Sequence, residues 1–216
     1  MRQTMWETYQ EYLIQQLNLS RTYDSTKQKG DVLLESNLYN GPGILKARET
    51  IIKVGETDIY NNIVYPNTGK NLPCFGMDFM CFFEQKVIVV FDFQHPTPHY
   101  DFRHPIVDEM LSDMLDNTTK GIRFFEPGNH FSRYIYVRHC TRKDIPDHLD
   151  AFKRYIDVYT RLIEEANPVN QDTIEFKEFD QYMLKLDPVS GYMASKFDKQ
   201  FAEDYVNNFL FSYANK

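Results

Sequence analysis

Apolar residues recur at helical spacing near both ends of the chain. Near the start, the residues that lie three or four positions apart are Trp6, Tyr9, Leu13 and Leu17. This spacing predicts an amphipathic helix, because residues three and four apart share one face of a helix. The same spacing returns after residue 140 and predicts three further helices, at residues 152–163, 176–186 and 197–210. Prolines at 168 and 188 mark the ends of the first two of these, since proline cannot continue a helix.

Between these helical regions the pattern is that of β-strands. Five segments are rich in β-branched and aromatic residues, and several are separated by Gly, Pro or Asn. They comprise residues 44–54, 58–66, 75–83, 87–93 and 131–139. The connection Glu84-Gln85-Lys86 is short, which predicts an antiparallel hairpin between the third and fourth segments. Residues 20–43 are polar and end in a turn signal, and residues 95–122 are expected to form a long connection with one short helix.

The segment at 75–83 defines the expected sheet. Side chains alternate between the two faces of a strand, and one face here carries Phe75, Met77, Phe79, Cys81 and Phe83. The other face carries Gly76, Asp78, Met80 and Phe82. Both faces are apolar apart from Asp78, so this strand is expected at the centre of a sheet covered on both sides. Strands followed by helices predict an α+β fold, and the length of 216 residues favours one domain over residues 1–216.

Composition narrows the class of protein. The 24 basic and 31 acidic residues give a net charge of −7, which argues against nucleic-acid binding because that requires a basic surface. No stretch approaches 18 apolar residues, and the three cysteines cannot form a disulfide framework. We therefore expect a soluble cytoplasmic protein that binds neither membrane nor nucleic acid.

Asp78 is the first candidate for chemistry. A carboxylate on an apolar strand face is expensive to keep ionised, so its pKa is expected to rise. A carboxylic acid with a raised pKa can donate a proton near neutral pH. The same pattern also fits an Asp whose carboxylate accepts hydrogen bonds from backbone amides.

Two other polar residues lie in informative places. Asn61 shares a strand face with Ile59, Ile63 and Tyr65, so its amide could orient a polar group of a ligand, although a bulge or a strand-end cap explains it as well. Asp187 precedes Pro188 and is expected in a turn between two helices, which is also a common place for a purely structural Asp.

Several familiar sites are not encoded. The sequence lacks the glycine-rich phosphate-binding motifs and the Gly-x-Ser-x-Gly motif of serine hydrolases. His95, His99 and His104 lie among prolines without a recognised zinc spacing, so we interpret them as loop residues and expect no metal site.

Several long strings resemble the ferredoxin-dependent bilin reductases. They are LKARETIIKV, DIYNNIVYPNTGKNLPCFGMDFM, VIVVFDFQHP, RFFEPGNHFSRYIYVR and LDPVSGYMASKF. The resemblance spans Ile44 to Tyr213 and is greatest for the phycoerythrobilin-forming branch from cyanophages. It implies an α/β/α sandwich in which helices flank a central antiparallel sheet and the bilin lies between the sheet and the C-terminal helices. It also implies a monomer located in the cytoplasm, which would be that of an infected cyanobacterial host if the protein is phage-encoded.

The resemblance implies a specific reaction. Biliverdin IXα would be converted to phycoerythrobilin by two successive two-electron reductions, first at the 15,16 bridge and then at the A-ring diene, through radical intermediates. Reduced ferredoxin would supply the electrons, and no cofactor would be bound. The alternatives are a two-electron reductase that stops at 15,16-dihydrobiliverdin, a non-catalytic bilin carrier, and an interaction domain without a pigment site.

The family's site residues map onto this chain. The resemblance implies that Asp78 and Asp187 are the catalytic acids. Asn61 occupies the position of a His in the phycocyanobilin-forming branch, and Thr50 the position of a Glu there. These two differences favour phycoerythrobilin as the product.

Basic residues are expected to contact the substrate and the electron donor. The bilin propionates require cationic partners, for which the candidates are Arg123, Arg133 and Arg138. Ferredoxins are typically acidic, so docking calls for a concentrated basic face. The candidates for that face are Lys196 with Lys199, or Arg142 with Lys143.

Overall fold

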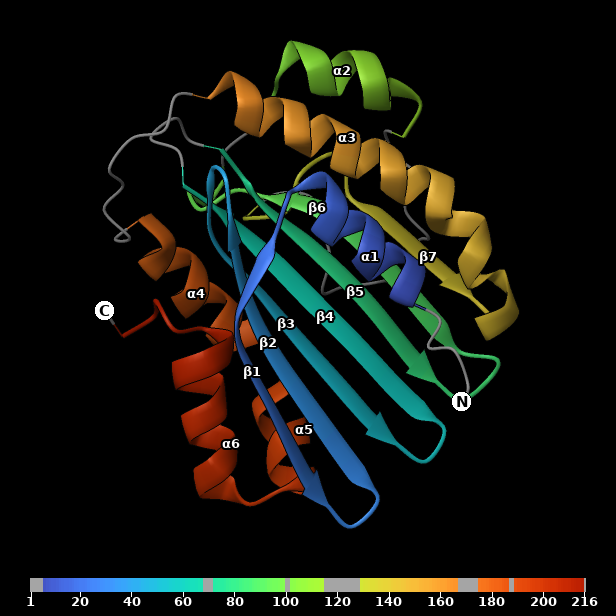
Figure 1. The fold of residues 1–216 in the computed structure, drawn as a ribbon, viewed down its shortest axis with the longest axis vertical. Helices are drawn as coiled ribbons and strands as arrows, with labels where there is room; N and C mark the ends of the chain where they lie inside the picture. The colour runs from blue at the N-terminus through green and yellow to red at the C-terminus, as the bar shows by residue number, and fades with distance from the viewer. Residues whose placement is uncertain are drawn as a thin grey trace.

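A computed structural model describes residues 6–67, 72–99, 102–114, 129–166, 175–186 and 189–215. Over these residues the chain forms one seven-stranded antiparallel sheet, in which the strands lie side by side in their order along the chain (Figure 1). The strands are β1 (Ser20–Lys29), β2 (Val32–Gly41), β3 (Ile44–Val54), β4 (Thr57–Pro66), β5 (Cys74–Phe82), β6 (Val87–Gln94) and β7 (Tyr136–Cys140).

Helices cover both faces of this sheet. They are α1 (Glu7–Gln16), α2 (Pro105–Leu111), α3 (Leu149–Glu165), α4 (Glu175–Leu186), α5 (Val189–Lys196) and α6 (Lys199–Tyr205), which continues into a π-helical turn at Val206–Leu210. Helices α1 and α3 lie on one face with α2 packed outside α3, and α4, α5 and α6 lie on the other (Figure 1). The expected α+β sandwich is therefore confirmed.

The face under α1 and α3 is a continuous aromatic core. Tyr9 of α1 lies edge-on to Phe79 of β5, with ring centroids 4.7 Å apart. Phe152 of α3 lies 5.1 Å from both Tyr9 and Phe91. Offset and edge-to-face contacts of this kind add to the free energy gained from apolar burial. This face therefore joins the two helices firmly to the sheet.

A buried carboxylate is enclosed in the same layer. Glu49 of β3 is 1% exposed, and it accepts hydrogen bonds from Gln10 of α1 and from Tyr60 of β4, each at 2.8 Å. Asn37 and Tyr39 of β2 donate to it at 2.7 and 3.3 Å. These donors compensate the loss of hydration, so Glu49 links one helix to three strands.

On the opposite face, under α4, α5 and α6, the apolar residues form three separate clusters rather than one, and we call this the divided face. Met183 of α4 packs against all three, and therefore lies where they meet. The polar residues of the candidate site lie on this divided face.

The structure differs from the expected elements at three places. Residues 20–41, expected as a polar segment, form the β1–β2 hairpin. Strand β1 is exposed along its whole length, so it shows no alternation of apolar and polar residues. Strand β7 begins at residue 136 rather than 131, and the expected turn after residue 187 contains the additional helix α5.

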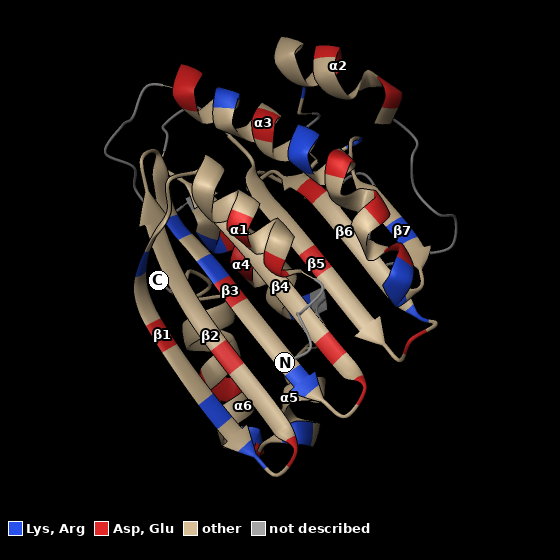
Figure 2. Cartoon of the chain, turned by 45° about the vertical axis from the view of Figure 1, so that its right-hand side comes forward, with Lys and Arg blue, Asp and Glu red and all other residues tan. Residues whose placement is uncertain are grey.

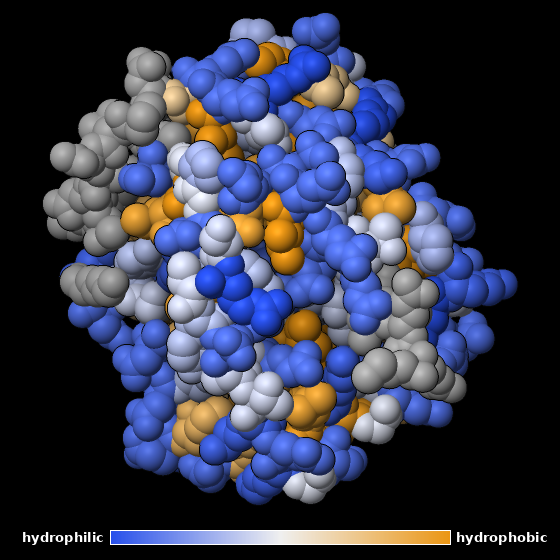
Figure 3. Space-filling model, viewed as in Figure 1, coloured by the Kyte–Doolittle hydropathy of each residue, from blue (hydrophilic) through white to orange (hydrophobic). Residues whose placement is uncertain are grey.

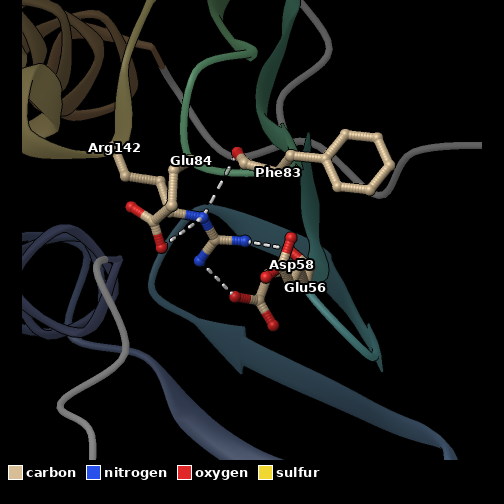
Figure 4. A network of polar contacts seen from close by, with 5 residues as sticks. All are labelled: Glu56, Asp58, Phe83, Glu84 and Arg142. Carbon is tan, nitrogen blue, oxygen red and sulfur yellow. Dashed lines mark hydrogen bonds and ion pairs between the residues drawn. The ribbon is translucent and has the colours of Figure 1, made fainter.

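One arginine, Arg142, links two hairpin turns at one end of the sheet (Figure 4). Arg142 follows β7, and its Nη1 donates to Asp58 of β4 at 2.6 Å. Its other nitrogens donate to the backbone carbonyls of Glu56 and Phe83, and its Nε lies 3.9 Å from a Glu84 carboxylate oxygen. The Arg142 side chain is only 11% exposed. It therefore joins the β3–β4 turn, the β5–β6 turn and the end of β7.

Replacing Arg142 is expected to destabilise the protein. Arg142→Gln should lower the free energy of unfolding by roughly 2 kcal/mol, because a largely buried guanidinium that joins Asp58 to the carbonyls of two turns is lost. Urea unfolding measures this change. The matched control is Arg154→Gln, which removes a more exposed ion pair with Asp113 and should cost less than about 1 kcal/mol. Equal losses in the two variants would contradict the role assigned to Arg142.

Candidate functional site

A row of polar residues crosses the divided face. In the strand register, Thr50 of β3 pairs with Asn61 of β4, and Asn61 pairs with Asp78 of β5. Directly paired residues point to the same face, so these three side chains lie next to one another. The row continues to Val90 of β6, which belongs to an apolar cluster against α4. Asn61 and Asp78 are half-buried under the C-terminal helices.

A directed chain of hydrogen bonds runs through this row. Nη1 of Arg48 donates to Oδ1 of Asn61, and Nδ2 of Asn61 donates to Oδ1 of Asp78 at 2.5 Å. An arginine can only donate, so it fixes which end of the Asn61 amide turns toward it. The amide nitrogen therefore faces the Asp78 carboxylate. The expected rise in the pKa of Asp78 stays a prediction.

Thr50 is bound to a buried tyrosine from the C-terminal helices. The hydroxyl of Tyr205 in α6 lies 3.0 Å from Thr50 Oγ1 and 2.8 Å from Ser36 Oγ of β2. Burial raises the pKa of Tyr205, so this phenol stays neutral near pH 7. These contacts join α6 to the row of polar residues.

A second acid reaches the same face from α4. Asp180 is fully buried, and it accepts hydrogen bonds from the Tyr65 hydroxyl at 2.8 Å and from the Tyr213 amide at 2.9 Å. Burial raises the pKa of this carboxyl group. Lys46 Nζ lies 4.3 Å from the Tyr65 ring and 4.0 Å from the Tyr213 ring. Asp180 therefore holds the end of the chain against β4.

Asp92 is a third acid on this face. It lies within β6, opposite Gly76, and is fully buried. Its carboxylate accepts hydrogen bonds from the Ser132 amide at 3.1 Å and from the Ser132 hydroxyl at 2.5 Å. Burial raises the pKa of Asp92 to about 7, and the bonds from Ser132 oppose that rise. Ser132 lies 40 positions away along the chain, so the sequence alone does not indicate this contact.

The structure brings together two of the predicted site residues. Asn61 and Asp78 are in direct contact on the face that the C-terminal helices cover. Arg133 is exposed, in the segment just before β7. Asp187 and Arg123 lie outside the described residues.

Arg138 lies on the other face of the sheet. It pairs with Val89 of β6, which belongs to the core under α1 and α3, whereas Asp78 pairs with Val90. The Arg138 guanidinium lies 4.3 Å from the centre of the Tyr136 ring. The structure therefore separates Arg138 from Asp78 by the thickness of the sheet.

Of the residues considered for ferredoxin docking, three have partners within the chain: Arg142, Lys196 and Lys199. Arg142 is held between the turns described above, and Lys199 lies 3.6 Å from Glu203. Lys196 lies 5.5 Å from the centre of the Tyr192 ring. Basic and acidic residues alternate along α3, and in this view the described part of the molecule shows mixed charge (Figure 2). The expected basic docking face stays a prediction.

Two surface hollows lie away from this site. One, of about 340 Å³, includes Gly43 and Ile163 in its lining, and the other, of about 350 Å³, includes Trp6 and Arg21. Neither is lined by Asn61 or Asp78. On the face shown in Figure 3, apolar side chains reach the surface only in small separate patches.

Sequence reasoning missed Arg48 and Asp180, although both left a signal. Arg48 lies two positions from Thr50, so alternation places the two on one strand face. Asp180 lies four positions after Phe176 and three before Met183, on the apolar stripe of a predicted helix. For Asp180, a charged residue on an apolar helix face is the informative exception.

Comparison with known proteins identifies the family to which this chain belongs. The family model described as "Ferredoxin-dependent bilin reductase" matches residues 2–212. The chain therefore belongs to the ferredoxin-dependent bilin reductase family. A membrane-spanning helix is absent from the part of the chain that the structure describes.

Individual relatives are distant in sequence. The chain is 26% identical over 201 residues to a 15,16-dihydrobiliverdin:ferredoxin oxidoreductase of Nostoc punctiforme, covering 87% of this chain and 82% of the relative. It is 27% identical over 196 residues to the protein of the same name from Synechococcus, covering 85% and 83%. Among solved structures it is similar to phytochromobilin synthase from tomato in complex with biliverdin, with a TM-score of 0.69 and 16% identity. That match covers 98% of this chain and 84% of the tomato protein, and it supports the fold.

Asp92 is expected to make stability depend on pH. Its pKa is about 7 in the folded protein against an ordinary value of 3.8, so between these values the folded state holds a proton that the unfolded chain releases. The free energy of unfolding should therefore fall as the pH rises through this range. From pH 5 to pH 8 the contribution is roughly 2–3 kcal/mol.

Urea unfolding of the wild type and of Asp92→Asn at several pH values tests this expectation. The amide of this variant cannot ionise, so the difference in stability between the two proteins should change across this range. The exposed Asp24→Asn serves as the control and should follow the wild type. Parallel curves for the wild type and Asp92→Asn would contradict the assignment.

Proposed function

We propose that this protein reduces biliverdin IXα with electrons from ferredoxin, and that Asp78 donates a proton to the bound bilin. The observation that carries the proposal is the contact between Asn61 and Asp78 on the face beneath the C-terminal helices, in a chain of the bilin reductase family. The tomato relative was solved with biliverdin, and the cyanobacterial relatives are named for dihydrobiliverdin and ferredoxin. These names support biliverdin as the substrate class.

The chemistry requires electrons and protons in equal number. Saturating one double bond of the bilin takes two electrons and two protons, so two reduced ferredoxins each give one electron and become oxidised. The first electron yields a bilin radical, whose added charge makes its carbon and nitrogen atoms more basic. Asp78 then transfers its proton to the bilin and recovers one from solvent before the next transfer. Conjugation over four rings delocalises the unpaired electron.

Two products are compatible with this chemistry. We propose that reduction begins at the 15,16 bridge and continues at the A-ring diene to phycoerythrobilin, with Asp187 as the second acid. The LDPVSGYM motif around Asp187 supports the second reduction. The competing function is a single reduction that stops at 15,16-dihydrobiliverdin, which is favoured by the name that the cyanobacterial relatives share.

A product assay distinguishes these functions. Biliverdin, ferredoxin and a reducing system are incubated with the protein without oxygen, and the pigments are separated by chromatography. Phycoerythrobilin as the final product supports two reductions, and 15,16-dihydrobiliverdin alone under excess reductant supports one. Bound but unreduced biliverdin would indicate a carrier, and an unchanged biliverdin spectrum on titration would contradict both reductase and carrier.

Replacing Asp78 is expected to separate binding from reduction. Asp78→Asn keeps the size of the side chain and its contact position, so the affinity for biliverdin should change less than about fivefold. It cannot donate a carboxylic proton, so turnover should fall by roughly 10²–10⁴-fold and a bilin radical should accumulate. Absorbance titration, turnover and electron paramagnetic resonance measure these effects. Asp24→Asn is the control, and turnover equal to the wild type in Asp78→Asn would remove Asp78 from the mechanism.

A further inference from the structure

Arg48 is a buried cation with few partners among the described residues. It lies in β3 and is 3% exposed, and its Nη1 donates to Asn61. Its Nε is buried and finds no hydrogen-bond partner in the described part of the chain. Over the same residues no carboxylate forms an ion pair with it. A guanidinium carries five N–H donors, so hydrogen-bonding capacity is left on this side chain.

The acids on the same face do not compensate this charge directly. Asp180 is close enough to Arg48 for their charges to interact, but its oxygens accept from Tyr65 and from the Tyr213 amide. Asp78 receives the Asn61 amide rather than the guanidinium. Burying a cation without a full set of acceptors costs several kcal/mol in typical proteins. The arrangement therefore weakens the fold unless a ligand supplies an acceptor.

We infer that Arg48 binds a carbonyl oxygen of the substrate, at a terminal lactam ring of the linear tetrapyrrole. The inference rests on the proposed function. Arg48 is joined to Asp78 through one intervening side chain, Asn61, so a ring held by Arg48 lies beside the acid that protonates it. Arg48 is then a substrate-binding residue that sets the position of the bilin along β3, β4 and β5.

A lactam carbonyl fits this place better than a propionate. Biliverdin carries its two carboxylates on the middle rings and its two neutral carbonyls on the end rings. A carboxylate at Arg48 would have to lose its hydration and lie on the same face as Asp78 and Asp180. A carbonyl accepts the open N–H groups without adding charge. Donation to it also withdraws electron density from the conjugated rings, so the bound bilin accepts an electron more readily.

The test compares binding with stability in Arg48→Met. This variant keeps the length and the apolar part of the side chain but removes every donor. Its affinity for biliverdin should fall about 10- to 100-fold, the loss typical of a charge-assisted hydrogen bond. The midpoint of urea unfolding without ligand should equal or exceed that of the wild type, because an incompletely paired buried charge is removed. A purely structural arginine would lower that midpoint, and this outcome would overturn the inference.

Two controls make the result specific. Lys46→Met removes a cation from the same face of β3 whose ammonium donates to Ser212 at 2.8 Å, and it should leave the affinity within about threefold of the wild type.

Biliverdin dimethyl ester keeps both lactam carbonyls but lacks free carboxylates, so Arg48→Met should weaken its binding by the same factor. If Arg48→Met has no effect on the ester, Arg48 binds a propionate and the assignment is wrong. If the wild type binds biliverdin and Arg48→Met binds it equally well, only the role of Arg48 fails; a wild type that does not bind biliverdin overturns the proposed function as well.

Discussion

Polar groups on the central strands cannot rely on bulk water, because helices cover both faces of the sheet. Each polar side chain placed there has to find its partners within the protein or in a ligand. Glu49 and Arg48 are adjacent in β3 and point to opposite faces, so they show the two outcomes side by side. Glu49 accepts hydrogen bonds from four side chains, whereas Arg48 donates to Asn61 and keeps a buried Nε without a partner among the described residues. Glu49 is thus satisfied within the protein, whereas Arg48 has hydrogen-bonding capacity left for a substrate.

The two faces of the sheet also differ in how their apolar residues pack. The aromatic core under α1 and α3 is continuous, and it holds the strands in a defined register. The opposite face has three smaller apolar clusters around the row formed by Thr50, Asn61 and Asp78. Proton donors have to be held at fixed positions to be effective, and a rigid sheet supplies this better than loops do. An enzyme that reduces a large flat pigment gains from such a wall, since the position of the pigment decides which carbon is protonated.

Much of this architecture could be predicted from alternation and periodicity. The strands at β3 to β6 and the helices α1, α3 and α4 follow patterns that burial imposes on a sequence. The strand pattern indicates both Asp78 and Asn61 as polar residues among apolar ones, and the resemblance to the bilin reductases supports both, but only the structure shows that they are in contact. The β1–β2 hairpin was missed because β1 is exposed on both faces, which leaves the chain free to be polar throughout. The helix α5 was missed because the Asp-Pro signal before it indicates a turn.

By itself the sequence determined which residues share a face of each element, because the period of a strand or helix is a local property of the backbone. It did not determine which residues of different elements meet. Only the tertiary structure decided that Arg48 orients Asn61, that Ser132 binds Asp92 from 40 positions away, and that Arg138 lies on the face opposite to Asp78. The register between strands decides these contacts, and a shift of one residue would turn every side chain of a strand to the other face. That register results from the packing of the whole sheet between its helices, so it cannot be read from any single segment.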